Sequence, residues 1–305
     1  MTIWRDVAGA AVAPRREPSA VTIGAFDGVH RGHQALLART REAGLPVVAV
    51  TFDPHPTAIF APDRVPKALT TMERRVELLQ QHGADEVRVL AFTPEMAAWS
   101  PEEFVRRALV DALSVRAVVV GQNFRFGARA AGDVASLSDL GTSHGFTAEG
   151  LALVGSGEPW SSTRVRSLVA DAQMREAAHV LGRPHEVVGE VLRGQQRGRE
   201  LGYPTANTPI DDSYAVPPDG VYAGRVVRAG GDAMAAAISI GTNPTFGEHE
   251  RRVESYVLDR SDLELYGETI RVELVDHLRP MVAFDGVDAL LAQMADDVAA
   301  TRRAL

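Results

Sequence analysis

The sequence predicts an α/β protein of two domains: a parallel sheet covered by helices, followed by an antiparallel β-barrel with a terminal helix. Three observations lead to this prediction. The 305 residues exceed the usual length of a single domain. Strand and helix patterns alternate through the first half, whereas strand patterns follow one another directly through the second. The pattern changes near residues 182–186, so we divide the chain into domains 1–184 and 185–305.

Four apolar segments of the first half are typical of buried strands: AVTIG (20–24), PVVAVTF (46–52), EVRVLAF (86–92) and VRAVVVG (115–121). Helical spacing lies between them over 33–44, 70–83 and 100–113, and a closing helix is expected over 161–182. Ser100, followed by Pro101 and two acidic residues, is a typical helix start, and Thr70 or Thr71 can cap the preceding helix. Strands that alternate with helices indicate a parallel sheet with both faces covered.

The second half contains five β-like segments: EVVGEVL (186–192), GVYAGRVVRAG (220–230), AMAAAISIG (233–241), VESYVLD (253–259) and TIRVELVDHL (269–278). Turn sequences such as PPDG (217–220) and AGGD (229–232) lie between them. A helical pattern returns only over 284–305. Closely spaced strands without intervening helices predict an antiparallel barrel, against which the last helix packs.

The composition excludes several classes of protein. Hydrophobic residues are 45% and charged residues 24%, as in ordinary globular proteins. The chain has no cysteine, which excludes disulfides and thiolate sites and fits a cytoplasmic location. A net charge of −8 disfavours nucleic acid as a partner. We expect no membrane association, because no run approaches the roughly 18 apolar residues of a spanning helix and the N-terminus lacks a signal-peptide pattern.

The most informative stretch of the first half is VTIGAFDGVHRGHQALL (Val21–Leu37). It reads as a strand, a glycine-containing loop and a helix start, and open parallel sheets bind ligands where their strands end. A helix N-terminus offers N–H groups to an anion, and Gly24 and Gly32 allow close approach. His30 and His33 would then bind phosphate oxygens and offset charge that builds on phosphorus. Zinc binding and purely structural roles are the alternatives, although the H-E-x-x-H spacing of many zinc sites is absent.

Three further motifs fall where strand ends or helix starts are expected. TFDPHP (51–56) and GQNFRFG (121–127) follow the second and fourth strands, and SSTRVR (161–166) opens the closing helix. The last motif offers hydroxyls, N–H groups and two arginines to a polyphosphate. Together with the histidine pair, these motifs predict a nucleotide phosphate site at one edge of the sheet.

The four motifs, in this order, resemble the adenylyltransferase half of the prokaryotic bifunctional riboflavin kinase/FAD synthetases. The resemblance implies a Rossmann-like nucleotidylyltransferase domain. The ATP-binding residues that it implies are Gly24, Phe26, Asp27, His30, Gly32, His33, Ser162, Thr163 and Arg164. Asn123, Phe124 and Arg125 would contact the flavin, and Asn123 would act in catalysis with the two histidines. Many relatives carry Asp at the position of Asn123, whose amide can hydrogen-bond phosphate but is not a charged metal ligand.

The runs GEVLRGQQRGRELGYPTANTP (189–209) and VESYVLD (253–259) resemble the riboflavin kinase half of the same family. The resemblance implies that ATP in this half contacts Gly194, Gly198, Arg199, Gly202, Thr205 and Asn207. Thr205 and Asn207 would also be ligands of magnesium, whereas a strand-edge turn fixed by Pro204 is the alternative role of PTAN. Glu254 would be the general base, with a solvent-facing acid as its alternative. Alternation along a strand puts Tyr256 and Leu258 on the same face as Glu254, and we expect both to contact the flavin. Tyr266 and Phe284 are further aromatic candidates, with a plain core role as the alternative for the aromatic residues.

The resemblance implies two reactions, with Mg2+ as cofactor: riboflavin and ATP give FMN, and FMN and ATP then give FAD and pyrophosphate. Three alternatives remain open: an enzyme with one of these activities and a regulatory second half, an adenylyltransferase for another substrate such as nicotinamide mononucleotide or phosphopantetheine, and a flavin carrier. Asp27 either assists magnesium or is simply the Asp of an Asp-Gly turn. The sequence does not fix the oligomeric state, and a transient homo-oligomer is compatible with it.

Overall fold

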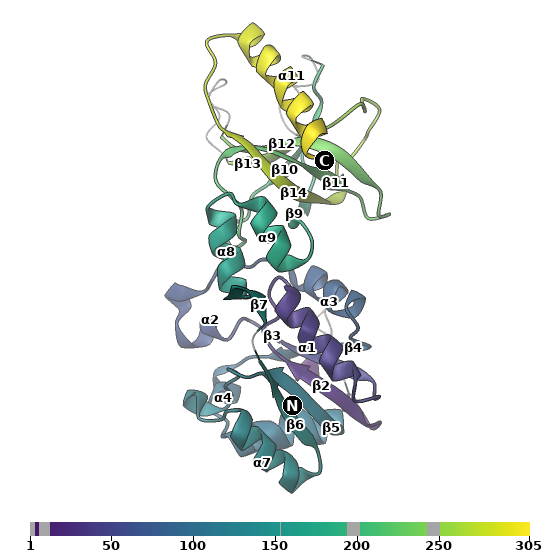
Figure 1. Ribbon diagram of the computed structural model, residues 1–305, viewed down its shortest axis with the longest axis vertical. Coiled ribbons are helices and arrows are strands. Elements are labelled where there is room, and N and C mark those ends of the chain that lie inside the picture. Colours follow the sequence, from purple (N-terminus) through teal and green to yellow (C-terminus); the bar gives the residue numbers. More distant parts are fainter. Residues whose placement is uncertain (1–3, 6–12, 153, 194–201, 243–250) are drawn as a thin grey trace. The chain divides into compact units, whose positions relative to one another are not determined.

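The first half folds around a six-stranded sheet (Figure 1). Its order is β1 (Trp4–Arg5), β4 (Glu86–Ala91), β3 (Val47–Asp53), β2 (Ser19–Ile23), β5 (Val115–Gly121) and β6 (Thr147–Leu151). The computed structural model describes residues 4–5, 13–152, 154–193, 202–242 and 251–305. β2 to β6 are parallel, and the short β1 runs antiparallel to β4. The predicted parallel sheet is therefore confirmed.

Helices cover both faces of this sheet, as expected. They are α1 (Arg31–Arg41), α2 (Thr57–Phe60), α3 (Met72–Gln81), α4 (Pro94–Ala97), α5 (Pro101–Phe104), α6 (Asp111–Leu113) and α7 (Val134–His144), with 3-10 turns η1 (Pro62–Arg64) and η3 (Ala128–Ala130) and a π-helical stretch η2 (Val105–Val110). Leu37 of α1 and Leu78 of α3 belong to one buried cluster, and Leu109 of η2 and Leu137 of α7 to another. A small hairpin, β7 (Gly155–Ser156) and β8 (Glu158–Pro159), follows.

The helix starts follow from local hydrogen bonding. The Thr71 hydroxyl accepts the backbone N–H of Arg74 at 3.2 Å and caps α3. The Ser100 hydroxyl does the same for Glu103 at 3.1 Å, ahead of the proline that opens α5. Both contacts satisfy N–H groups that have no partner inside a helix. Of the two cap candidates at 70 and 71, the structure selects Thr71.

The second half contains a six-stranded antiparallel sheet. Its order is β10 (Thr205–Pro209), β13 (Arg252–Val257), β12 (Ala233–Gly241), β11 (Gly220–Val227), β14 (Thr269–Pro280) and β9 (His185–Glu190). An isolated bridge pairs Leu192, just after β9, with Asn207 of β10, so the two edges of the sheet approach each other. α11 (Val287–Ala304) packs on β11, β12 and β14. The predicted antiparallel sheet and terminal helix are confirmed.

The expected closing helix over 161–182 is instead two helices, α8 (Ser162–Ala170) and α9 (Met174–Leu181). Ala172 between them has a φ of 56°, in the left-handed region. A residue in that conformation ends an α-helix, because it directs the chain away from the helical path. The prediction of one continuous helix was therefore wrong, since helical spacing on both sides conceals the break.

The chain forms two compact units, which interleave in sequence. The first unit holds residues 1–66 and 71–161, and the second holds 67–70 and 162–305. Within the second unit, Ala68 pairs with the segment before β11: its N–H donates to Ser213 O at 2.8 Å, and its carbonyl accepts from Ala215 N at 2.8 Å. Arg166 Nε also donates to Lys67 O at 2.6 Å. The four residues 67–70 are thus built into the second unit.

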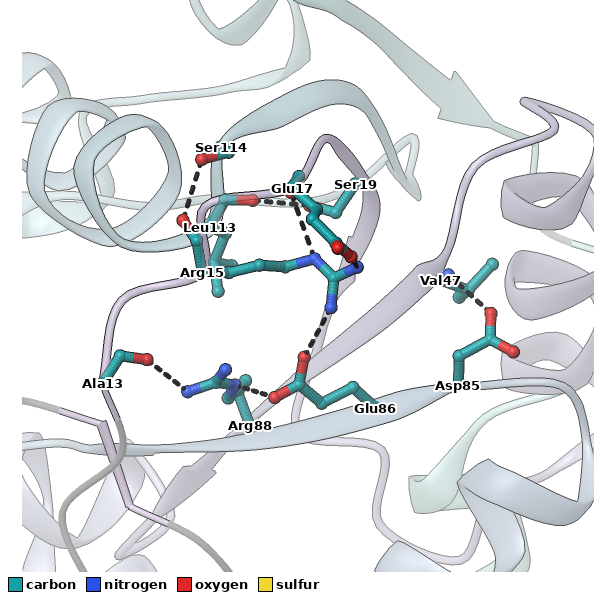
Figure 2. A network of polar contacts seen from close by, with 10 residues as sticks. All are labelled: Ala13, Arg15, Glu17, Ser19, Val47, Asp85, Glu86, Arg88, Leu113 and Ser114. Atoms are coloured by element: carbon teal, nitrogen blue, oxygen red, sulfur yellow. Dashed lines mark hydrogen bonds and ion pairs between the residues drawn. The ribbon is translucent and has the colours of Figure 1, made fainter.

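Figure 2 shows how the segment before β2 is fastened to the first sheet. Arg15 donates through Nη1 to Glu86 Oε2 at 3.1 Å, and its carbonyl accepts the Ser114 hydroxyl at 2.8 Å. Arg88, only 6% exposed, donates through Nη1 to Ala13 O at 3.0 Å and forms an ion pair with Glu86. Side chains thus satisfy backbone carbonyls of a segment that forms no regular strand.

Candidate active sites

The loops that follow β2, β3 and β5 leave the same edge of the first sheet. These three strands are neighbours and parallel, so their carboxyl ends lie together. The loop with the two histidines follows β2, TFDPHP begins in β3 and continues beyond it, and GQNFRFG begins at the last residue of β5. This edge is where open parallel sheets bind ligands. The structure thus brings together three of the four predicted phosphate-site motifs.

The two histidines stack on each other at the start of α1. Their ring centroids are 3.6 Å apart and the rings are inclined by 22°. α1 begins at Arg31, two residues earlier than expected, so His30 is its N-cap and His33 lies in its first turn. Residues three apart on a helix face the same way, which explains the spacing of the pair. Both imidazoles therefore lie beside the N–H groups and positive dipole of a helix N-terminus.

The loop before the pair has an unusual backbone. Phe26, Gly28 and Val29 have φ values of 50°, 80° and 41°, all in the left-handed region. Phe26 and Val29 are fully buried. Left-handed conformations cost non-glycine residues about 1–3 kcal/mol each and cluster at functional sites. The loop that presents the histidines is therefore strained, and the packing around it must hold it.

Gly32 is required by close packing. A Cβ at this position would lie 3.0 Å from Cε1 of His30 and 3.4 Å from the carbonyl oxygen of Trp160. Any larger residue would have to displace the His30 ring or the Trp160 backbone. This contact also places Trp160 beside the histidine pair, where the Arg31 guanidinium lies 5.8 Å from the centroid of its ring.

The electrostatics of the pair suit an anionic ligand. Burial lowers the pKa of the His33 imidazole well below its ordinary value, and the neighbouring His30 and Arg75 lower it further. His33 is therefore neutral at pH 7 without a ligand, and a bound phosphate would raise its pKa. His33 Nδ1 and Trp160 Nε1 are buried and have no hydrogen-bond partner within the described residues. Buried polar atoms are normally bonded, so these two fit a polar ligand.

Asp27 is engaged inside the protein. It is 3% exposed, and its Oδ1 accepts Nη2 of Arg75 at 3.0 Å. Gly24 has room for a side chain, since a Cβ would meet only the Phe26 ring at 3.4 Å. Asp27 is thus paired with Arg75 of α3.

The expected flavin residues after β5 have different environments. Asn123 and Arg125 are exposed, and Arg125 pairs with Asp133 at 3.2 Å. Phe124 is partly buried and packs on the cluster that contains Phe126, with their ring centroids 5.6 Å apart. Of the three, the two polar side chains face solvent and could meet a ligand, whereas Phe124 contributes mainly to the core.

The fourth motif belongs to the second unit except for Ser161, the last residue of the first. Ser162 and Thr163 open α8, and Arg164 follows in its first turn. Arg164 was predicted from the sequence to bind ATP, and the motif was noted to offer two arginines; Arg166, the second, donates through Nε to Lys67 O at 2.6 Å. Trp160 and Arg75 were missed: neither belongs to a recognisable motif.

The second unit brings the predicted kinase residues onto one face of its sheet. Asn207 lies directly opposite Glu254 across β10 and β13, and Ser239 of β12 lies opposite Glu254 on its other side. Thr205 lies opposite Tyr256 in the same register. Residues of this face are partly exposed, whereas the alternate residues of β10 and β13 are buried. The proposed base and the proposed magnesium ligands therefore share a half-open polar face.

A cavity of about 450 Å³ adjoins this face. Its lining includes Asn207, Arg193, Arg251 and Arg252. Arg252 precedes Glu254 by two residues on β13. Such a cavity has the size of a small-molecule site. Arg193 and Arg252 are suited to phosphate, whereas Arg251 is already paired with Asp219 at 2.6 Å. These arginines were not singled out from the sequence, although Arg193 lies within the run 189–209 that was considered there.

The aromatic part of the expected flavin site is only partly as expected. Tyr256 packs against Tyr203, with ring centroids 5.0 Å apart, and burial raises the pKa of its hydroxyl. β13 ends at Val257, so the alternation does not extend to Leu258, which is 7% exposed. Gly202 has a φ of 82°, which only glycine adopts freely. Gly194, Gly198 and Arg199 lie outside the described residues, as does most of GTNPTFG (241–247).

The donors on this face fit magnesium. Thr205 and Asn207 supply a hydroxyl and an amide oxygen from alternate positions of one strand, and the Asn207 amide is held by a hydrogen bond from Nδ2 to Thr205 O at 3.2 Å. Magnesium prefers such oxygen ligands together with substrate phosphates.

Among the described residues no group of three or more His, Cys, Asp or Glu could hold a metal ion. No helix in the described part of the chain is long and apolar enough to cross a membrane.

Comparison with known proteins agrees with this geometry. The family model described as FAD synthetase matches residues 12–164, and the one described as riboflavin kinase matches residues 181–305. The bifunctional riboflavin kinase/FMN adenylyltransferase of Escherichia coli K12 is 36% identical over 97% of this chain and 96% of its own. Its namesake from Pseudomonas fluorescens is 38% identical over 95% and 94%.

A crystal structure titled as a macrolide-efflux protein from Streptococcus pneumoniae superposes with a TM-score of 0.84 and 31% identity, covering 95% of each chain. The same two-part architecture thus occurs in a solved structure. Full-length identity above 30% and the two family matches, one for each half, lead to one conclusion: this chain belongs to the bifunctional riboflavin kinase/FMN adenylyltransferase family.

Proposed function

We propose that this chain makes FAD from riboflavin in two ATP-dependent steps, phosphorylation to FMN and adenylyl transfer to FMN. The observation that supports this most is the presence of two separate polar sites. The first unit presents a stacked histidine pair at a helix start. The second presents Glu254 directly opposite Asn207, next to a cavity. Each half-reaction thus has a set of residues suited to it.

In adenylyl transfer, an oxygen of the FMN phosphate attacks the α-phosphorus of ATP. A new phosphoanhydride bond forms, the bond to the β-phosphate breaks, and pyrophosphate leaves. No covalent intermediate with the protein is needed, so positioning and charge stabilisation supply the catalysis. His30 and His33 donate hydrogen bonds to phosphate oxygens, with the N–H groups at the start of α1. Ser162, Thr163 and Arg164 or Arg166 bind the triphosphate, and Asn123 orients the reacting groups.

In riboflavin phosphorylation, a hydroxyl of the ribityl chain attacks the γ-phosphorus of ATP. Glu254 accepts the hydroxyl proton, the new ester bond forms, and ADP leaves. Thr205 and Asn207 would hold magnesium, which would supply positive charge beside the transferring phosphate. Arg252 lines the cavity beside these residues and is placed to meet phosphate oxygens. Tyr256 offers an aromatic surface to the flavin.

We further propose that the activities divide at residues 1–184 and 185–305, although α8 and α9 fold with the second unit. The small-molecule substrates, the net charge of −8 and the absence of cysteine favour a cytoplasmic enzyme without a nucleic-acid or membrane partner. A transient homo-oligomer is compatible with this function.

The proposal is tested by incubating the purified chain with riboflavin, ATP and magnesium and separating the flavins by chromatography. FMN should form first and FAD later. A parallel incubation with FMN in place of riboflavin isolates the second step. Chelation should stop both steps, and added magnesium should restore them. A product mixture that stops at FMN would leave a single-activity kinase, and conversion of FMN alone would leave a single-activity adenylyltransferase.

A further inference from the structure

Arg75 of α3 holds the loop that presents the histidine pair. It is 6% exposed. Its Nη1 donates to Ala25 O at 3.1 Å, and its Nη2 donates to Asp27 Oδ1 at 3.0 Å. The two acceptors lie on either side of Phe26, whose φ is 50°. One rigid guanidinium therefore holds the backbone carbonyl before a strained residue and the side-chain carboxylate after it, which its planar fork does better than a flexible ammonium.

A second contact strengthens this clamp. The Thr51 hydroxyl of β3 donates to the same Ala25 carbonyl at 3.0 Å. Inside the loop, the Val29 N–H donates to Phe26 O at 3.0 Å. A left-handed Phe persists only where its surroundings hold it there. α3 and β3 supply that support from outside the loop.

Ring contacts connect the loop to both imidazoles. The Phe26 ring meets the His33 ring edge to face, with centroids 5.1 Å apart at 77°. His33 in turn stacks on His30 at 3.6 Å. A shift of Phe26 would therefore move His33, and His33 would move His30. The Arg75 guanidinium is also near enough to lower the pKa of His33, after burial and His30.

We propose that Arg75 is a positioning residue for adenylyl transfer: by binding the Ala25 carbonyl and the Asp27 carboxylate on either side of Phe26, it fixes the two imidazoles without touching either substrate. This inference rests on the proposed adenylyl transfer at His30 and His33. A misplacement of catalytic groups by about 1 Å can slow a reaction about 100-fold. Loss of the Arg75 contacts should therefore slow FAD formation strongly, even where the first unit remains folded.

The chain offers a matched control in Arg88. This arginine is also 6% exposed, and it also binds one backbone carbonyl, Ala13 O, and one carboxylate, Glu86 (Figure 2). Its contacts belong to the segment before β2 rather than to the histidine loop. Arg75→Lys and Arg88→Lys are thus equivalent lesions of a buried guanidinium, and only the first lies on the path to the histidines.

The test measures FAD formation from FMN for both variants. Arg75→Lys should lower kcat about 10–100-fold and change KM for ATP less than about threefold, since positioning acts on the reacting geometry. Arg88→Lys should retain the rate. All three tryptophans (Trp4, Trp99 and Trp160) belong to the first unit, so urea unfolding followed by tryptophan fluorescence reports its stability directly. Equal loss of rate in the two variants, or an Arg75→Lys rate within about twofold of wild type, would overturn the inference.

Two further variants keep the test decisive if Arg75→Lys unfolds. Thr51→Val removes the other donor to Ala25 O and should lower the rate several-fold with the unit still folded; an unchanged rate would refute the clamp. Arg75→Met removes the charge, so an NMR titration of His33 should show a raised pKa. A wild-type chain that makes FMN but no FAD would refute the proposed adenylyl transfer, and this titration would then decide the Arg75–His33 coupling by itself.

Discussion

Removing α9 should destabilise the second unit severely, although no predicted kinase residue lies in it. Met174, Val180 and Leu181 are each 1% exposed, and α9 packs on β14, β9 and α8. Burying one such side chain contributes about 1.5–3 kcal/mol, so the three contribute up to about 9 kcal/mol. Most domains have a total stability of about 5–15 kcal/mol. A fragment that begins at residue 183 should therefore be marginal or unfolded, whereas one that begins at 162 should fold.

The assay compares fragments 162–305 and 183–305 by urea unfolding, followed by far-ultraviolet circular dichroism because neither contains tryptophan. With a urea slope of about 2 kcal/mol per M, the midpoint should fall by roughly 2–4 M. Both fragments lack residues 67–70, so that loss cancels between them. Leu181→Ala in the longer fragment is the graded control and should cost about 2–5 kcal/mol. Equal midpoints for the two fragments would refute the reasoning and would place the end of the kinase fold at residue 183.

Four further outcomes are expected. Replacing both His30 and His33 with Ala should abolish FAD formation and leave riboflavin phosphorylation intact; normal FAD synthesis would contradict phosphate binding by the pair. Glu254→Gln should slow phosphorylation by about 10²–10⁴-fold with little change in riboflavin KM or in FAD formation, and a rate within about twofold of wild type would remove Glu254 from the mechanism. Gly32→Ala should weaken adenylyl transfer, because its Cβ would lie 3.0 Å from the His30 ring; an unaltered KM and kcat for ATP would show that the ring can move freely. The tryptophan-detected stability should decline as pH falls below about 6.5, because the folded state resists protonation of His33 and the unfolded state does not, and His33→Gln should flatten that decline; an identical pH dependence in the variant would refute it.

The sequence predicted the architecture well because its periodicities are strong. β3 and β5 are nearly continuous apolar runs with helical patterns between them, and both faces of their sheet are covered. The divided helix over 162–181 was missed because Ala172 is a good helix former in a left-handed conformation, which local propensity does not reveal. The membership of residues 67–70 in the second unit depends on pairing with Ser213 and Ala215, distant in sequence. No local pattern carries such information.

The candidate sites show the same division. The histidine pair and the Asn207–Glu254 pair were found from short motifs, and the structure places each pair together. Arg75 and Trp160 were missed because their roles arise from tertiary contacts with the histidine loop. The alternation expected for Leu258 failed because the strand ends one residue earlier. A strand ends where its backbone hydrogen bonds to the neighbouring strand end. The alternation of side chains alone does not reveal that point.

The inclusion of residues 67–70 in the second unit affects how the protein is made. Lys67 and its donor Arg166 are 99 residues apart. Ribosomes add about 5–20 residues per second. About 5–20 s therefore pass between the synthesis of Lys67 and that of Arg166. The interval between the synthesis of Ala68 and that of its partners Ser213 and Ala215 is longer still. During this interval the connection from β3 to α3 is a natural target for proteases on the nascent chain, and codons that slow translation between residues 70 and 215 would lengthen its exposure.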